Sequence, residues 1–216
     1  MPRATKEDLV LETSLALFAT HGYHAVGVDR IKEASGVAKM TLYKHFPTKD
    51  ILIEKVLVRR DEHMRAGLLA AIAEPKVQAQ GPLAQLRAVF GWHRQWFASP
   101  AFHGCMFIKA SEEFLDDASG IRGVSRVHKL WLRDLMDGLL QQAGAAQHAA
   151  LAAHLLIVLD GLIVDANLFR GQDQVDSTWV MVQDLLAQHL PAQTVAAKAA
   201  RACARRPAAK RAAGRR

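Results

Sequence analysis

The chain has 216 residues, half of them hydrophobic, and a formal net charge of +7. This length allows one large domain or two small ones, and the dominance of Leu, Ala, Val and Ile favours a soluble all-α fold with a sizeable core. Two cysteines, Cys105 and Cys203, exclude a disulfide framework, and the most apolar run, 155–164, is too short and too interrupted to span a membrane. With no apolar run after the N-terminal charges, we expect a cytoplasmic protein without a signal peptide or membrane segment.

The positive charge is concentrated at the C-terminal end. Residues 195–216 contain eight Lys and Arg side chains and no acid, which leaves 20 basic and 21 acidic side chains in the rest of the chain. The folded part is therefore nearly neutral. A DNA-binding function must be argued from a local motif and not from the overall charge.

Apolar residues recur at helical spacing along most of the chain, between glycine and proline breaks. The predicted helices are 5–21, 28–35, 39–45, a long helix from about 48 to 72, 83–98, 101–115, 121–143, 147–170 and 174–190. We expect a linker at 74–82. These breaks divide the chain into residues 1–50, residues 51–190 and a basic tail at 191–216 that we expect to be disordered.

The segment 27–55 is the most informative part of the sequence. It contains two short helices joined by a tight turn at Gly36, a stop at Pro47 and a new helix capped by Thr48. The second short helix turns Leu42 and Phe46 inward and leaves several hydrogen-bond donors outside, which is typical of a helix that enters the DNA major groove. The alternative is a polar helix exposed to solvent only.

Lys49 lies in the first turn of the helix that Thr48 caps. A cation is unfavourable there by roughly 0.3–1 kcal/mol, and an external anion held by the free backbone N–H groups reverses this cost. A DNA phosphate is the natural anion. The alternative is a lysine side chain extended into solvent.

The run from Gly36 to Asp50, with Leu17-Phe18 and Gly22-Tyr23 upstream, resembles the N-terminal domain of TetR-family transcriptional regulators. The resemblance implies a homodimer on double-stranded DNA, in which each subunit has a three-helix DNA-binding domain and a larger helical domain. It also implies that residues 1–50 form the DNA-binding domain and that residues 51–190 form the domain that dimerises and binds a small-molecule effector. The positions that it assigns to DNA are Lys39, Met40, Thr41, Tyr43, Lys44, His45 and Lys49, with Lys39 and Met40 at base edges and the others mainly at phosphates.

Two residues depart from the family pattern. Gly27 and Ala38 stand where Ser or Thr often caps the second and third helices, and Ala is a poor cap. Met40 is apolar on a surface assigned to DNA, and our hypothesis is that it contacts a thymine methyl group.

Residues 83–143 are rich in large apolar side chains, which are typical of a core and also of an effector pocket. The pocket prediction is a list of six residues: Trp92, Trp96, Phe102, Cys105, Phe107 and Trp131. His103 and Cys105 are too isolated to indicate a zinc site, and no nucleophile–base pair is visible. We therefore predict no metal, no cofactor and no catalytic residue.

The last two helices are apolar on more than one face, which predicts packing against both the domain and a second copy. The residues assigned to the dimer interface are Leu155, Leu159, Leu162, Trp179, Val182 and Leu186. The basic tail has two open interpretations, a nonspecific DNA tether and a solubilising end.

The sequence thus favours a DNA-binding transcriptional regulator, a ligand-responsive repressor. One rival is a structural DNA-binding protein of the nucleoid type that needs no effector. The weakest alternative is a small helical enzyme with a pocket thiol or histidine.

Overall fold

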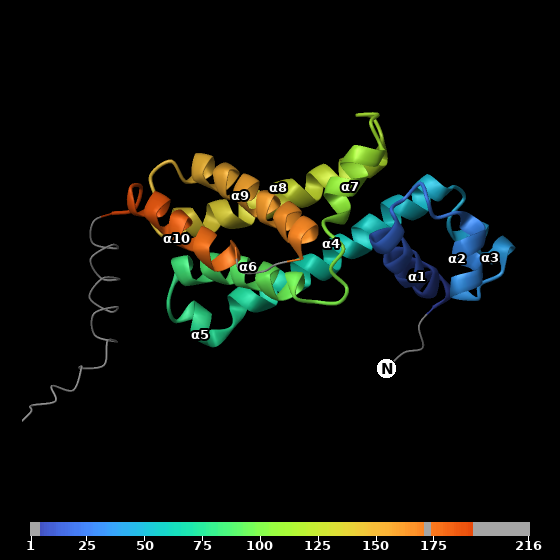
Figure 1. The fold of residues 1–216 in the computed structure, drawn as a ribbon, viewed down its shortest axis with the longest axis horizontal. Helices are drawn as coiled ribbons and strands as arrows, with labels where there is room; N and C mark the ends of the chain where they lie inside the picture. The colour runs from blue at the N-terminus through green and yellow to red at the C-terminus, as the bar shows by residue number, and fades with distance from the viewer. Residues whose placement is uncertain (1–4, 171–173, 192–216) are drawn as a thin grey trace, which may run out of the picture.

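A computed structural model describes residues 5–170 and 174–191, and all regular structure within these ranges is helical (Figure 1). The helices are α1 (Lys6–His21), α2 (Val28–Ser35), α3 (Lys39–His45), α4 (Lys49–Ala73), α5 (Pro75–Gln78), α6 (Pro82–Phe97), α7 (Met106–Glu113), α8 (Gly120–Gln142), α9 (His148–Phe169) and α10 (Gln174–Ala187). The predicted all-α fold is confirmed. The basic tail and Cys203 lie outside the described residues.

The ends of the first helices follow from local chemistry. Thr5 and Asp8 form a reciprocal capping box, in which the Thr5 hydroxyl accepts from the Asp8 N–H at 3.0 Å. Thr48 caps α4 by accepting from the Ile51 N–H at 3.2 Å. Gly27 and Ala38 make no side-chain cap, as expected from their residue types. Gly36 ends α2 with a φ of +67°, a conformation that favours glycine.

Helices α1, α2 and α3 pack around a shared core at one end of an elongated molecule, with α10 near the other end (Figure 1). Phe18, Ile31 and Leu42 are at most 1% exposed there. Helix α4 has 25 residues, about 37 Å at 1.5 Å per residue. It starts in this group and continues into the larger group of helices, so any tilt of α4 moves the two groups relative to each other.

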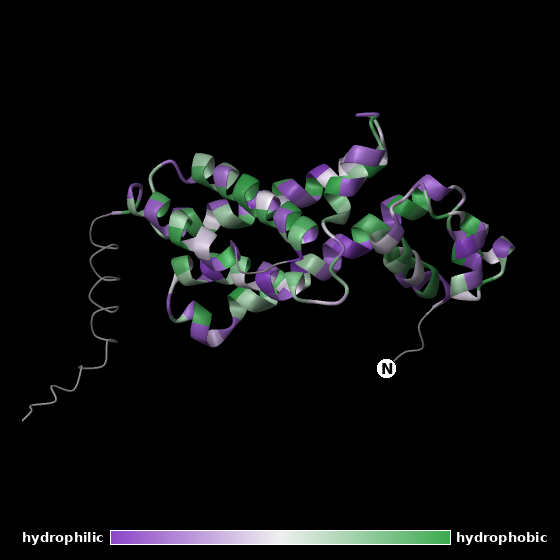
Figure 2. Cartoon of the chain, in the orientation of Figure 1, coloured by the Kyte–Doolittle hydropathy of each residue, from purple (hydrophilic) through white to green (hydrophobic). Residues whose placement is uncertain are grey.

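The larger group is built on α4, α6, α8 and α9, and α8 packs extensively against α9. Figure 2 shows hydrophobic and hydrophilic residues interspersed along these helices, as expected where one side of a helix is buried. Helix α9 is long and apolar enough to cross a membrane by composition alone. In this structure α9 packs against α6, α8 and α10, with Leu155 and Leu159 fully buried, so one side of its apolar surface belongs to the core.

Two predicted segments differ from the structure. The linker 74–82 contains the short helix α5, which Pro75 begins, and α6 starts at Pro82. The predicted helix 101–115 is helical only over α7, because Gly104 has a φ of +82° and Cys105 is extended. Phe114 is also extended and ends α7.

Candidate nucleic-acid interface and linked pocket

Helix α3 is anchored by its inward side and exposed on its outer side. Leu42 and Phe46 are 1% exposed, whereas Met40 is 83% exposed and Tyr43 is 39% exposed. Met40, Thr41, Tyr43 and Lys44 line one shallow depression on the surface. The outward orientation expected from the sequence is therefore present, and contact with DNA stays a prediction.

Two of the predicted DNA-binding side chains have acidic neighbours. The Lys39 ammonium lies 3.1 Å from the Asp29 carboxylate, and His45 lies 3.5 Å from Glu7. Both pairs are solvent-accessible, and such pairs contribute about 0–1 kcal/mol. A phosphate or a base edge can therefore replace Asp29 as the partner of Lys39 at little cost. Sequence reasoning missed this pair, because the two residues lie on different helices.

Lys49 is half-buried in the first turn of α4, next to the Thr48 cap. It forms no ion pair with any residue in the part of the chain that the structure describes. The cation at this helix start therefore lacks an anion of the protein's own, which is the arrangement that the phosphate hypothesis requires.

A second feature of the site is the contact between α7 and the turn after α1. The Glu113 carboxylate accepts from the backbone N–H of Tyr23 at 3.0 Å and from that of His24 at 2.8 Å. The Tyr23 hydroxyl donates to the Met106 carbonyl at 2.8 Å, and Lys109 donates to the Ala19 carbonyl at 2.9 Å. Both ends of α7 are thus tied to the group that carries α3. We call these four residues, Tyr23, Met106, Lys109 and Glu113, the α7 latch.

Burial keeps the latch tyrosine in its donor form. Tyr23 is 0% exposed, and desolvation raises the pKa of its phenol well above the usual range. Its ring packs against Phe18 and Phe114, with centroid distances of 5.3 and 5.7 Å. Tyr23 therefore lies where the small N-terminal core meets α7.

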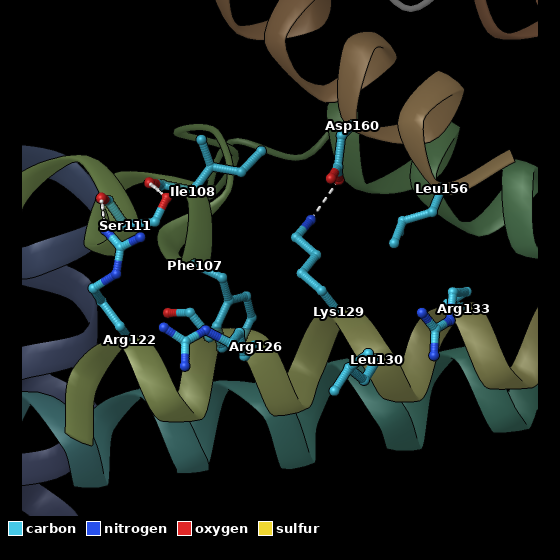
Figure 3. A pocket seen from close by; sticks show the side chains of 11 residues that line it. Phe107, Ile108, Ser111, Arg122, Arg126, Lys129, Leu130, Arg133, Leu156 and Asp160 are labelled. Atoms are coloured by element: carbon cyan, nitrogen blue, oxygen red, sulfur yellow. Dashed lines mark hydrogen bonds and ion pairs between the residues drawn. The ribbon is translucent and has the colours of Figure 1, made fainter. Parts of the chain in front are cut away.

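A pocket of about 310 Å³ opens between α7, α8 and α9 (Figure 3). Its lining residues are Phe107, Ile108, Ser111, Arg122, Ser125, Arg126, Lys129, Leu130, Arg133, Leu156 and Asp160. Helix α7 therefore lines the pocket with Phe107, Ile108 and Ser111 and makes the latch contacts with other residues.

The six residues predicted to form the pocket are placed differently. Only Phe107 lines this pocket. Trp96 packs against Trp92 and Phe102 at centroid distances of 5.9 and 5.0 Å, and the Arg60 guanidinium lies 5.1 Å from its ring.

The remaining two residues are also packed. Cys105 is 4% exposed, and the Trp131 ring lies 4.6 Å from the Arg65 guanidinium. These large aromatic side chains fill the interior between the helices, whereas the pocket lies outside that interior, so their part in an effector site stays a prediction.

Two histidines are buried in the larger group of helices, and one of them, His128, contacts the pocket residue Phe107. The His128 ring stacks on Phe107 with centroids 3.8 Å apart and shares a hydrogen bond of 2.8 Å with Asp61. His93 is fully buried, and desolvation lowers its pKa to about 4. Burial also lowers the pKa of His128, against the opposing effect of Asp61. Both rings are therefore neutral at neutral pH.

The six residues predicted for the dimer interface are buried within one chain. Leu155, Leu159, Leu162, Trp179, Val182 and Leu186 are 0–8% exposed. Side chains covered to this degree by their own chain offer little surface to a partner, and their assignment to a dimer interface stays a prediction. The apolar side chains that point outward from the same helices are Ile157, Val164, Leu168, Phe169, Val180 and Met181, which are 46–75% exposed.

Over residues 5–170 and 174–191, no group of three or more His, Cys, Asp or Glu side chains is placed to hold a metal ion.

Similarity to known proteins decides the family. Residues 5–56 match the model of bacterial regulatory proteins of the tetR family. The solved structure of SCO4454, a TetR-family transcriptional regulator from Streptomyces coelicolor, is 32% identical and covers 85% of this chain and 95% of that one, with a TM-score of 0.77. The chain belongs to the TetR family.

Two curated relatives of this TetR-family protein carry opposite regulatory names. The transcriptional activator FasR of Mycolicibacterium smegmatis is 32% identical over 90 residues, which covers 42% of this chain and 41% of FasR. The transcriptional repressor ComR of Escherichia coli is 26% identical over 173 residues, which covers 77% of this chain and 81% of ComR. The chain thus spans less than half the length of FasR, and most of ComR. These relatives are regulators, not enzymes.

Proposed function

We propose that this TetR-family protein is a ligand-responsive transcriptional repressor that binds a palindromic operator as a homodimer in the cytoplasm. The observation that carries the proposal is the exposed outer face of α3, where Met40 and Tyr43 stand out from a helix whose other side is fully packed. An aromatic and an apolar side chain are exposed here among hydrogen-bond donors. This combination fits a surface that meets base edges and phosphates.

Within this proposal, Lys39 and Met40 read base edges, and Thr41, Tyr43 and His45 hold phosphates together with Lys49. Lys44 contributes to either. Lys39 leaves Asp29 on binding, and Lys49 supplies a phosphate-binding cation beside the free N–H groups at the start of α4.

The dimer surface that the exposed residues support runs along the outer side of α9. Ile157, Gly161, Val164 and Leu168 follow one another at spacings of four, three and four, so they share one helix face. A Cβ atom added to Gly161 would meet nothing within 4 Å, so the backbone of a second helix can approach closely there. Val180 and Met181 extend the apolar surface on α10. A two-fold dimer through this face places two α3 helices on one duplex, about 34–36 Å apart in successive major grooves.

The α7 latch gives the effector a route to DNA. A ligand between α7 and α8 contacts the helix whose other side holds the turn at Tyr23 and His24. Movement of α7 thus changes how the α1–α3 group sits on α4, and it alters the separation of the two α3 helices in the dimer. Allosteric coupling of this kind requires about 1–3 kcal/mol.

The repressor assignment rests on the longer of the two similarities. The match to the protein named repressor ComR extends through both groups of helices, whereas the match to the protein named activator FasR covers 90 residues. The sign of regulation is read directly from transcription in vitro at a promoter that carries the selected operator.

The test is selection of bound sites from random DNA, followed by nuclease footprinting on the selected sequence. The proposal expects one palindromic sequence and a footprint of defined length. Uniform coverage without a preferred sequence contradicts it and favours the nucleoid-type alternative.

A further inference from the structure

The outer side of α8 carries four cations in one row. Arg122, Arg126, Lys129 and Arg133 follow at spacings of four, three and four, and all four line the pocket between α7, α8 and α9 (Figure 3). The only acid among the described lining residues is Asp160. The lining therefore has an excess of positive charge, although residues 66–194 as a whole contain more acids than bases.

Two of the four cations make contacts that join different helices or helix ends of the protein. Arg122 donates to the Ser111 carbonyl at 2.8 Å and to the Phe114 carbonyl at 3.1 Å, which closes the C-terminal end of α7. Lys129 donates to Asp160 and so joins α8 to α9 across the pocket. Neither cation can turn to a ligand without loss of these contacts.

The other two cations can exchange their partners. Arg126 lies 3.1 Å from Asp117, whose side chain is 81% exposed on the turn before α8. Arg133 is paired, within the described chain, with its neighbour Asp134 at 3.3 Å, and that carboxylate is 68% exposed. Because exposed pairs of this kind contribute about 0–1 kcal/mol, a ligand carboxylate bound through two parallel N–H donors competes well with either acid.

The wall between these arginines is apolar. Phe107 and Ile108 come from α7, Leu130 from α8 and Leu156 from α9, and Figure 3 shows their side chains around the row of cations. Leu130 is 45% exposed, so its apolar surface is accessible to a ligand in the pocket. The volume of about 310 Å³ lies at the low end of the range of about 300–1,000 Å³ for small-molecule pockets.

From this combination we infer that the pocket binds an amphipathic carboxylate, with the carboxylate on Arg126 or Arg133 and the apolar body against Leu130, Leu156 and Phe107. This inference rests on the proposed function, because the carboxylate serves as the effector of the regulator. The positive charge of the row on α8 disfavours a cationic ligand. A neutral apolar ligand offers no acceptor that could replace Asp117 as the partner of Arg126 or Asp134 as the partner of Arg133.

The test is calorimetric titration of the full-length protein with two carboxylates, octanoate and 2-naphthoate, and with their neutral counterparts, octanamide and 2-naphthamide. The inference expects the carboxylates to bind at least 10-fold more tightly than the amides. The double variant R126Q/R133Q should lose this preference while its affinity for the amides is unchanged. R94Q removes an arginine that is also exposed but lies outside the pocket, and it should keep the preference.

Three binding results overturn the inference: neither carboxylate binds, the amides bind as tightly as the carboxylates, or R126Q/R133Q keeps the preference. Sedimentation of the double variant is the control for its assembly, and a changed oligomeric state assigns these arginines to a subunit contact, which also overturns it.

DNA binding separates this failure from failure of the proposed function. If the protein selects a palindrome but carboxylates fail to bind in the pocket, the regulator proposal stands and only the ligand class is wrong. If no sequence is selected, the regulator proposal fails whatever the titrations show.

Discussion

Replacement of Glu113 by alanine tests the α7 latch, the contact that links the pocket-lining helix α7 to the α1–α3 group. The Glu113 carboxylate accepts two backbone N–H groups, from Tyr23 at 3.0 Å and from His24 at 2.8 Å. A hydrogen bond to a charged group contributes about 1.5–3 kcal/mol, and the exposed bond to His24 contributes less than the part-buried one to Tyr23. We expect a local loss of about 2 kcal/mol, which corresponds to roughly 30-fold in the opening equilibrium of this turn.

Hydrogen–deuterium exchange measures this loss directly. In E113A the amides of Tyr23 and His24 should exchange roughly 30-fold faster than in the wild type, because both lose their acceptor. E112A is the matched control, since the Glu112 side chain is exposed on the same helix and accepts no hydrogen bond from the described residues. Unchanged exchange in E113A, or equal acceleration in E112A, would refute the latch.

The remaining predictions concern DNA affinity, pH dependence and assembly. Asp29→Asn should strengthen DNA binding severalfold in fluorescence anisotropy, because it releases Lys39 and removes a negative charge from the DNA-facing surface. Lys49→Ala should weaken binding to all sequences and reduce the slope of log K against log salt by about 0.9. As the pH falls from 6.5 to 4, the contribution of His93 to the free energy of unfolding should fall by about 3 kcal/mol, because the His93 side chain binds a proton over that window in the unfolded chain and, with a pKa of about 4, not in the folded protein. Ile157→Asp should shift the protein from dimer to monomer in sedimentation, since it places a charge on the exposed face of α9.

Each of these has a control and a contradicting result. Glu33→Gln, an exposed acid on α2, is the control for Asp29; equal strengthening in both variants means a general charge effect. If Lys49→Ala leaves the slope of log K against log salt unchanged, Lys49 does not contact a phosphate. In His93→Gln the pH dependence of unfolding should be smaller by about 3 kcal/mol, and a curve identical to that of the wild type contradicts the assignment to His93. A stable Ile157→Asp dimer excludes the α9 face.

The N-terminal elements were predictable because their determinants are local. The glycine with positive φ at Gly36, the stop at Pro47 and the Thr48 cap each act within a few residues, so helix bounds from 28 to 49 follow from the sequence. The inward direction of Leu42 follows in the same way from helical spacing.

The parts that sequence reasoning missed depend on contacts between distant residues. Glu113 and Tyr23 are separated by 90 positions, and neither residue type indicates the other. In α9 the apolar residues surround the helix, so periodicity identifies a buried helix but not the side that stays exposed. Ile157 and Leu159 look equivalent in sequence, yet one is 69% exposed and the other 0%.

Sequence reasoning missed the pocket between α7, α8 and α9 for a related reason. Aromatic residues such as Trp96 and Phe102 mark the interior, whereas the pocket is defined by arginines on the outer side of α8 that the sequence presents as an ordinary solvent-exposed helix face. A cationic row at helical spacing was the available signal, and its meaning depended on α7 and α9 enclosing it.

The central claim is that α3 enters the major groove, and methylation protection on the selected operator measures this most directly. Dimethyl sulfate modifies guanine N7, which lies in the major groove. The account predicts two protected patches separated by one helical turn, about 10 base pairs, with Met40→Ala and Lys39→Ala altering protection within these patches. Guanines that stay fully reactive throughout a saturated complex would contradict it.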